Sequence, residues 1–416
     1  MSLPSPNRSA PPASVDPDLW RASLSAGGED GQVVRYLDLL LAHAHQMHAS
    51  DLHFEPYDGQ FRVRMRVDGQ LRAVSAPPLN LKDRLSSRIK VLARLDISEK
   101  RLPQDGRMRH KVSATLSTDC RVSTLPTVCG EKVVVRLLDA SPAHLDVDAL
   151  GYEPAQKQAL LEAIHRPWGM VLVTGPTGSG KTLSLYSGLN LLNQVGLNIS
   201  TAEDPSEINL PGINQVNISE KAGLTFAVAL RAFLRQDPDV IMIGEIRDLE
   251  TADMALKAAQ TGHLVLSTLH TNDAPSSLVR LRHMGVAPYN ITASLALVTA
   301  QRLVRRLCLA CRQPIEVPRT HLRQAGCRAE DLDGDWQLYA PVGCAQCHQG
   351  YVGRVGVFQV MPVSEEIQRL VLRDASSAEV AQQASREGVL SLREAGLRKV
   401  KLGLTSLEEI LTHVNA

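Results

Sequence analysis

The spacing of hydrophobic and polar residues changes character along the chain. In the first 140 residues apolar and polar positions alternate, as in Phe61-Arg62-Val63-Arg64-Met65-Arg66-Val67, which predicts strands with one buried face. Asp68-Gly69 predicts a hairpin turn after this strand, and apolar stripes at about 32–50 and 82–95 predict helices. We therefore expect a small α/β domain at residues 31–139.

After residue 151 the predicted strands are continuous apolar runs at 170–174, 197–202, 239–244 and 264–268, with helical patterns between them. This alternation is typical of a parallel, doubly wound sheet with helices on both faces. The other boundaries follow from composition: a disordered tail or residual docking segment at 1–30, a linker at 140–150, the doubly wound core at 151–305, a cysteine-bearing module at 306–357 and a helical region at 358–416.

The run at 170–174 leads into Gly175-Pro176-Thr177-Gly178-Ser179-Gly180-Lys181-Thr182, which fits the phosphate-binding loop G-x-x-x-x-G-K-[ST]. The glycines let backbone N–H groups turn toward phosphate oxygens, and the helix predicted after the loop adds its positive N-terminal dipole. Lys181 can reach the β- and γ-phosphates, and the Thr182 hydroxyl can hold Mg²⁺. A chance glycine turn is disfavoured because a strand precedes the loop and a helix follows it.

Two acidic residues end predicted strands. Glu203 follows the run at 197–202, and Glu245 follows the run at 239–244 in the pattern of a Walker B strand. Ligands of such sheets bind at the carboxyl ends of the strands, so both acids are expected beside the loop. One of them can orient or deprotonate the attacking water while the other serves Mg²⁺, although solvated strand ends are the alternative.

Two histidines bracket the run at 264–268. We predict that His270 takes part in catalysis and that His263 senses the γ-phosphate, because polar groups at the ends of an apolar strand suit those roles. The alternative is a pair of structural histidines hydrogen-bonded to the backbone.

Four cysteines form the pattern C-x₂-C…C-x₂-C, namely Cys308, Cys311, Cys344 and Cys347. Two such pairs complete a tetrahedral sulfur site that suits Zn²⁺, and free or redox-active thiols are the alternative. Cys120, Cys129 and Cys327 have no partner pattern and are expected to be ordinary residues. A second metal site at His43, His45, His48 and His53 is disfavoured, because positions 43 and 45 point to different faces of a helix.

Composition excludes several classes of protein. The formal net charge of the 416 residues is +1 and only 4% are aromatic, which disfavours direct binding of nucleic acid. No apolar run approaches the roughly 18 residues of a membrane span, and the N-terminus lacks a signal-peptide pattern. We therefore expect a cytoplasmic protein that reaches a membrane only through partners.

In combination these motifs resemble the traffic ATPases of type II secretion and type IV pili. The resemblance extends to Glu203-Asp204-Pro205, Gly244-Glu245-Ile246-Arg247-Asp248 and Thr261-Gly262-His263, and in the first domain to Ala49-Ser50-Asp51-Leu52-His53-Phe54-Glu55-Pro56. It implies a RecA-like P-loop domain preceded by a smaller, PAS-like α/β domain. The segment Ala202-Glu203-Asp204-Pro205-Ser206-Glu207 departs from the usual Val-Glu-Asp-Pro-Ile-Glu but keeps the acids. The usual N-terminal docking domain is expected to be missing or reduced to residues 1–30.

The resemblance also implies a homohexamer in which each nucleotide lies between the P-loop domain of one subunit and the first domain of the same subunit or a neighbour. Arginines would neutralise the developing phosphate charge there. Arg64 and Arg66 are the catalytic candidates, and Arg62, Arg231, Arg235 and Arg247 are further candidates. Because Arg62, Arg64 and Arg66 alternate, they share one face of a strand, where either an anion or water must cover them.

These features together predict a hexameric, cytoplasmic, Mg²⁺-dependent ATPase with a structural Zn²⁺ site. By resemblance it would drive pseudopilus assembly for type II protein secretion, bound at the inner membrane through the cytoplasmic domains of secretion platform proteins. Type IV pilus assembly is the alternative within the class, although the Gln301–Cys308 run looks most like the secretion branch. A nucleic-acid motor and a scaffold that binds ATP without turnover are alternatives of other classes.

Overall fold

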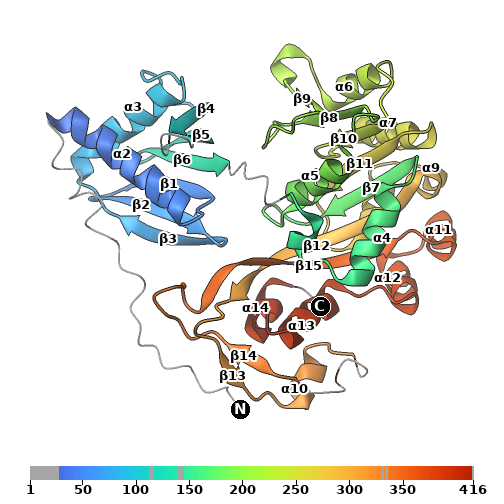
Figure 1. Ribbon diagram of the computed structural model, residues 1–416. Coiled ribbons are helices and arrows are strands. Elements are labelled where there is room, and N and C mark those ends of the chain that lie inside the picture. The colour runs from blue at the N-terminus through green and yellow to red at the C-terminus, as the bar shows by residue number, and fades with distance from the viewer. Residues whose placement is uncertain (1–27, 112–116, 139–144, 329–331, 333–335, 415–416) are drawn as a thin grey trace. The chain divides into compact units, whose positions relative to one another are not determined.

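The computed structural model describes residues 28–111, 117–138, 145–328, 332 and 336–414. The chain divides into two compact units, residues 1–140 and 141–416, and each is described by itself (Figure 1).

The first unit is a six-stranded antiparallel sheet with helices on one face. Its strand order is β3-β2-β1-β6-β5-β4. The elements are α2 (Gly28–Gln46), β1 (Asp51–Tyr57), β2 (Gln60–Val67), β3 (Gln70–Ser75), the 3₁₀ turn η1 (Leu79–Leu81), α3 (Lys82–Leu92), β4 (Gln104–Lys111), β5 (Ser117–Thr127) and β6 (Gly130–Leu138). Positive φ angles of 50° at Asp68 and 84° at Gly69 form the predicted hairpin turn. Strand β4 was not predicted, because its alternation is interrupted by Gly106.

The second unit contains a seven-stranded sheet in the order β15-β12-β7-β11-β10-β8-β9. The strands are β7 (Gly169–Thr174), β8 (Ile199–Glu203), β9 (Asn214–Asn217), β10 (Val240–Ile243), β11 (Leu264–Leu269), β12 (Leu295–Leu307) and β15 (Tyr351–Pro362). Strands β7 to β12 are parallel, as expected, but β15 runs antiparallel to β12, so a wholly parallel sheet was wrong. Strands β9, β12 and β15 were not among the predicted runs.

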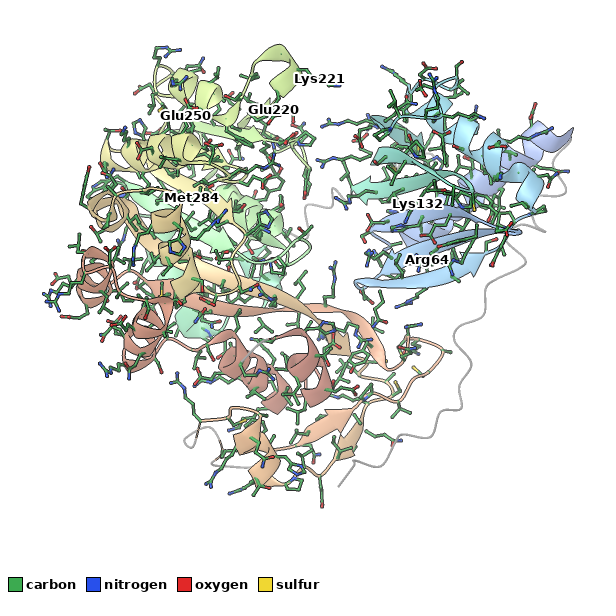
Figure 2. The ribbon with its side chains drawn as sticks, turned by 180° about the vertical axis from the view of Figure 1, so that it is seen from behind. Arg64, Lys132, Glu220, Lys221, Glu250 and Met284 are labelled. Carbon is green, nitrogen blue, oxygen red and sulfur yellow. The ribbon has the colours of Figure 1, made fainter. Side chains whose placement is uncertain are left out.

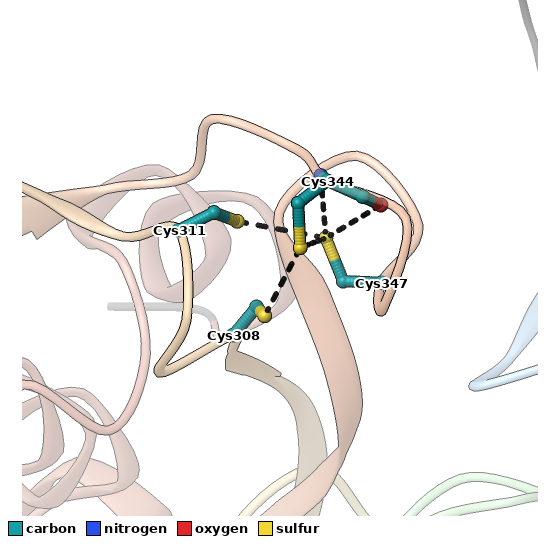
Figure 3. A group of neighbouring side chains, drawn as sticks. All are labelled: Cys308, Cys311, Cys344 and Cys347. Atoms are coloured by element: carbon teal, nitrogen blue, oxygen red, sulfur yellow. Dashed lines mark hydrogen bonds between the residues drawn. The ribbon is translucent and has the colours of Figure 1, made fainter.

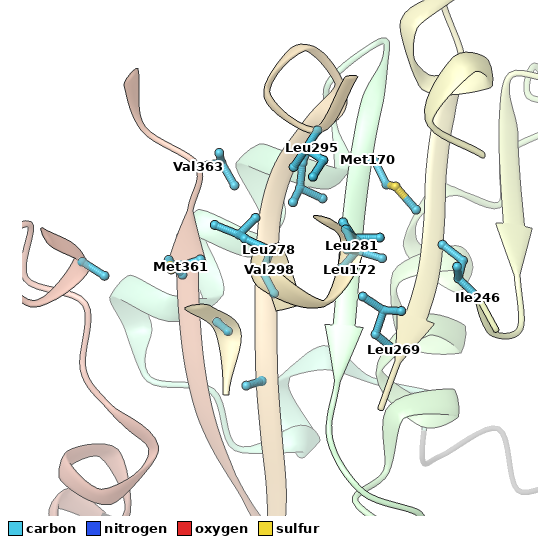
Figure 4. Packing of buried hydrophobic residues seen from close by; sticks show 14 of the residues in the cluster. Met170, Leu172, Ile246, Leu269, Leu278, Leu281, Leu295, Val298, Met361 and Val363 are labelled. Atoms are coloured by element: carbon cyan, nitrogen blue, oxygen red, sulfur yellow. The ribbon is translucent and has the colours of Figure 1, made fainter. Parts of the chain in front are cut away.

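Helices cover both faces of this sheet. They are α4 (Pro154–Ile164), α5 (Lys181–Leu192), α6 (Phe226–Phe233), α7 (Leu249–Gln260), α8 (Ala274–His283) and α9 (Pro288–Ser294), with 3₁₀ turns η3 (Val147–Leu150) and η4 (Glu220–Ala222). Alternate residues of β7 face opposite cores. Met170 and Leu172 pack with the helices α6 to α9 (Figure 4), whereas Val171 and Val173 pack with α4 and α5. Burial on both faces explains why β7 is a continuous apolar run.

The cysteine-bearing segment lies between two neighbouring strands of the sheet. Leu307 at the end of β12 pairs with Tyr351 at the start of β15, so the segment that leaves the sheet is 308–350 rather than 306–357. It contains β13 (Gln313–Ile315), α10 (Arg319–Gln324) and β14 (Leu338–Ala340). After β15 come α11 (Glu365–Leu372), α12 (Ser377–Arg386), α13 (Leu392–Lys401) and α14 (Leu407–His413). No helix within the described ranges combines the length and apolarity that a membrane span requires.

Candidate nucleotide-binding site

The phosphate loop connects β7 directly to α5. Gly175, Gly178 and Gly180 have φ angles of 151°, 79° and 89°, a region that side chains rarely tolerate. Gly180 caps α5, so the helix begins at Lys181 with its free N–H groups facing the loop. The predicted loop therefore has the strand, the backbone and the helix terminus that phosphate binding needs.

The Lys181 side chain folds back across the loop. Its Nζ donates hydrogen bonds to the carbonyl oxygens of Gly175 at 2.9 Å and Pro176 at 3.1 Å. Burial lowers the pKa of Lys181 and the nearby Glu245 carboxylate raises it, and the net result lies below the ordinary value. Glu245 is thus close enough to act electrostatically on the loop lysine.

Glu245 and His270 meet at the carboxyl ends of β10 and β11. His270 Nε2 lies 3.3 Å from Oε2 of Glu245, and Arg247 forms an ion pair with Oε1 of the same carboxylate. Burial raises the pKa of Glu245, but hydrogen bonds and attraction from Arg247 and His270 outweigh it, so the pKa is lowered. Strands β7, β11 and β10 are neighbours in the sheet and run parallel. This group therefore lies at the same carboxyl end of the sheet as the loop.

Glu203 is far more enclosed than Glu245. Its exposed fraction is 4%. The Tyr186 hydroxyl donates to Oε2, while Thr201 Oγ1 donates to Oε1 at 2.6 Å and Gln215 Nε2 at 3.0 Å. Tyr186 belongs to α5, so the acid is tied to the helix that starts in the phosphate loop.

The two predicted histidines lie at opposite ends of β11. His270 follows the strand and contacts Glu245, whereas His263 precedes it, and the His263 carbonyl accepts a hydrogen bond from the N–H of Gly169 at the start of β7. His263 Nδ1 lies 2.9 Å from the carbonyl oxygen of Ala258. His263 lies at the amino end of the sheet, whereas the phosphate loop lies at the carboxyl end, one strand length away. This position does not support a sensor role for His263 at the loop.

Only one of the three candidate arginines of the second unit joins the acids. Arg247 contacts Glu245 and lies 3.4 Å from Oδ2 of Asp204. Arg231 on α6 instead forms an ion pair with Glu250, which is labelled in Figure 2, and Arg235 donates to the carbonyl of Arg231 at 2.8 Å.

The three arginines of β2 share the sheet face opposite α2 and α3, as their alternation predicted. Glu55 on β1 compensates two of them: Arg64 Nε and Nη2 donate to its carboxylate at 2.7 and 2.8 Å, and Arg62 lies at 3.3 Å. Lys132 on β6 adds a contact of 3.1 Å from the other side, and Arg64 and Lys132 are labelled in Figure 2. Arg66 lies 3.5 Å from Asp51. The anions that these arginines require are therefore supplied by the same sheet.

Several residues that support the site were not predicted. Gln301 of β12 hydrogen-bonds the phosphate loop, and Arg302 donates to the carbonyl oxygen of Asn272 at 3.1 Å. Thr174 Oγ1 lies 2.6 Å from Oγ1 of Thr271, which fastens the segment after His270 to the end of β7. Sequence motifs do not reveal these contacts, because the contacts depend on which strands lie next to one another in the sheet.

The four cysteines converge in the segment 308–350 (Figure 3). The Sγ atoms of Cys308 and Cys344 are 3.9 Å apart, and those of Cys311 and Cys347 are 3.6 Å apart. A tetrahedral metal with bonds of about 2.3 Å to sulfur needs sulfur–sulfur edges of roughly 3.8 Å, so the sulfurs fit such an ion. Within the described part of the chain no other such grouping occurs, and His43, His45, His48 and His53 form none.

The fold and the loop define an α/β P-loop domain of the kind found in ATPases. Residues 27–412 match the family described as Type II/IV secretion system protein, and the chain belongs to this family. The predicted resemblance is thereby confirmed.

The type IV pilus assembly ATPase PilB of Acinetobacter baylyi is 57% identical over 383 residues, which are 92% of this chain and 66% of that protein. The type II secretion system protein HxcR of Pseudomonas aeruginosa is 50% identical over 385 residues, 92% of this chain and 78% of that protein. The chain thus spans about two thirds of the length of the PilB relative.

Solved structures support the fold. The ATPase DotB of Legionella pneumophila superposes with a TM-score of 0.66 at 21% identity, over 90% of this chain and 94% of that one. The pilus retraction motor PilT superposes with a TM-score of 0.60 at 24% identity, over 90% and 96%. At these identities the likeness concerns the fold alone.

Proposed function

We propose that the chain is a Mg²⁺-dependent ATP hydrolase. The observation that carries this proposal is the meeting of Lys181, Glu245 and His270 at one edge of the second-unit sheet. The loop N–H groups and Lys181 would bind the phosphates, and Thr182 would hold Mg²⁺, which neutralises phosphate charge when bound. Glu245 is partly exposed, and its lowered pKa keeps the carboxylate ionised, so it can orient the attacking water or accept a proton from it.

Glu203 and His270 contribute differently in this proposal. Three donors already occupy Glu203, so it acts through Tyr186 by holding α5 against β8. His270 orients the Glu245 carboxylate. This division assigns catalysis to one acid and positioning to the other.

We further propose that the active form is a homohexamer with a PAS-like first domain. In it Arg62, Arg64 and Arg66, and Arg247 from the second unit, would approach the phosphates, as the resemblance implies. Two hydrogen bonds to Glu55 fix the orientation of the Arg64 guanidinium, which reduces the entropy lost on phosphate binding. The tetracysteine site would hold Zn²⁺ in a structural role, since its four thiolates leave no open position.

The proposed output is pseudopilus assembly for type II protein secretion, by a cytoplasmic protein held at the inner membrane by platform proteins. Type IV pilus assembly is the second candidate. Relatives named type II secretion proteins are 44–50% identical and relatives named PilB are 44–57% identical, so the names support both.

The enzymatic part is tested with the purified chain. We expect ATP turnover that requires Mg²⁺ and disappears in Lys181→Ala, together with a hexamer in light scattering when nucleotide is added. If Lys181→Ala hydrolysed ATP as fast as the wild type, the proposed site would be refuted. The two outputs are separated by measuring binding to the cytoplasmic domains of the secretion and pilus platform proteins from the same genome, and binding to neither would contradict both.

A further inference from the structure

The run from Gln301 to Cys308 has no role in the hydrolysis described above, yet its first residue touches both ends of the phosphate loop. Ala300 of β12 pairs with Thr174 of β7, so Gln301 lies beside Gly175, where the loop begins. The contact is close, since a Cβ atom at Gly175 would come within 2.5 Å of the carbonyl oxygen of Gln301.

The side chain of Gln301 reaches the far end of the loop. Its Nε2 donates a hydrogen bond to the carbonyl oxygen of Ser179 at 2.7 Å, and its Oε1 accepts one from Ser184 Oγ at 2.8 Å. The residue is 2% exposed. Both polar atoms of the amide therefore have partners, so the side chain is fixed in one orientation.

The Ser179 carbonyl belongs to the same planar peptide unit as the N–H of Gly180. In a trans peptide the carbonyl and the N–H point in opposite directions. Holding the carbonyl against β12 therefore turns the Gly180 N–H away from β12 and toward the concave side of the loop. Gly180, at φ 89°, has no side chain that would restrict the rotation of this peptide, so the hydrogen bond from Gln301 is needed to fix it.

We propose that Gln301 is a positioning residue for nucleotide binding, which fixes the Ser179–Gly180 peptide so that the Gly180 N–H faces the phosphates. The inference rests on the proposed function, because it needs a nucleotide at this loop. The inference assigns the geometry of the phosphate loop to a contact from β12, a strand that is distant from the loop in sequence.

The test compares Gln301→Leu with the wild type in ADP and ATP binding by calorimetry. We expect dissociation constants to rise roughly tenfold or more, the factor that loss of one hydrogen bond to a charged group gives. In turnover KM should rise more than kcat falls, because the N–H contacts phosphate in both the ground state and the transition state.

Gln359 of β15 provides a matched control. It is also a buried glutamine in this sheet, and its Oε1 accepts a hydrogen bond from the N–H of Ala274 at 2.9 Å, away from the loop. Gln359→Leu should lower the melting temperature, as Gln301→Leu does, but leave nucleotide affinity within about twofold. A merely structural role for Gln301 would give both variants the same small change in affinity.

If Gln301→Leu does not fold, Gln301→Met gives the same comparison, since its unbranched side chain has a similar length and adds no charge. Its thioether cannot donate to the Ser179 carbonyl and should weaken binding about as much. If the wild type binds nucleotide and either folded variant binds it equally well, the inference fails while the proposed function stands. If the folded wild type binds neither ADP nor ATP, the proposed function fails and takes the inference with it.

Discussion

The hydroxyl of Tyr186 on α5 donates a hydrogen bond to the carboxylate of Glu203 at the end of β8. Burial and the Glu203 charge together raise the pKa of Tyr186, so the hydroxyl keeps its proton at any working pH. Because α5 begins in the phosphate loop, this pair links β8 to the helix that follows the loop. Glu203 can therefore matter for turnover without touching nucleotide.

Replacing Tyr186 by Phe should leave Oε2 of Glu203 buried without its donor. We expect the free energy of unfolding to fall by about 1–3 kcal/mol, the cost of an unsatisfied buried acceptor. Urea denaturation followed by circular dichroism measures this. Tyr289→Phe is the control, since Tyr289 is 66% exposed, and equal stability of the two variants would contradict the assignment.

Replacing Glu245 by Gln should lower kcat by about 10² or more while ADP binding persists, because general-base catalysis contributes that much. Steady-state turnover and ADP calorimetry separate the two effects. Glu250→Gln is the matched control, because that carboxylate pairs with Arg231 instead of joining the loop. Turnover unchanged in Glu245→Gln would remove Glu245 from the mechanism.

Glu55 should make the stability of the first unit depend on acid pH. Burial raises the pKa of Glu55, but hydrogen bonds from Arg64 and Lys132 outweigh it and lower the pKa from 4.5 to about 2. A lowered folded-state pKa stabilises the protein above the unfolded value, and this stability is lost as pH falls from about 4.5 toward 2.

Calorimetric unfolding of the wild type and Glu55→Gln tests this dependence. We expect the wild type to be more stable by about 2–3 kcal/mol at pH 7, with the difference shrinking below pH about 4.5. Asp119→Asn is the control, since its pair with Arg109 is exposed and should contribute almost nothing. A difference that did not change with pH would show that the charge of Glu55 is not responsible.

Purified protein should contain equimolar zinc, measured by elemental analysis, and Cys344→Ser should lose most of it. Loss of metal should also loosen the C-terminal helices, because the N–H of Leu307 bonds the carbonyl of Leu404 directly beside Cys308. Limited proteolysis would detect this as new cleavage after residue 390. Cys129→Ser should keep both zinc and protection, and zinc-free wild type would refute the site.

Sequence predicted the parts of the site that are contiguous in the chain. The phosphate loop and the cysteine pairs carry their chemistry in a few neighbouring residues, and strand runs placed Glu245 and His270 beside the loop. The sensor role predicted for His263 was not supported, because His263 precedes β11 and lies at the amino end of the sheet, whereas the loop follows the carboxyl end of β7.

The unpredicted parts depend on neighbours that are distant in sequence. Gln301 reaches the loop because β12 lies next to β7, and β12 was not recognised as a strand because Gln301, Arg302 and Arg305 interrupt its apolar run. The burial of Glu203 arises from Tyr186 and Gln215, which no local pattern relates to it. The charge balance of Arg64 likewise required the register of β1 against β2.

The pairing of Leu307 with Tyr351 has an evolutionary consequence. Paired residues of antiparallel strands are only about 5 Å apart, so a two-residue turn could replace the whole segment 308–350 and leave the central sheet in register. A segment inserted in this way can be gained, lost or exchanged without a new hydrophobic core for the sheet. Its structural contribution then lies in its contacts with the C-terminal helices, such as Arg312 with the carbonyl of Gly403 and Arg328 with Glu394.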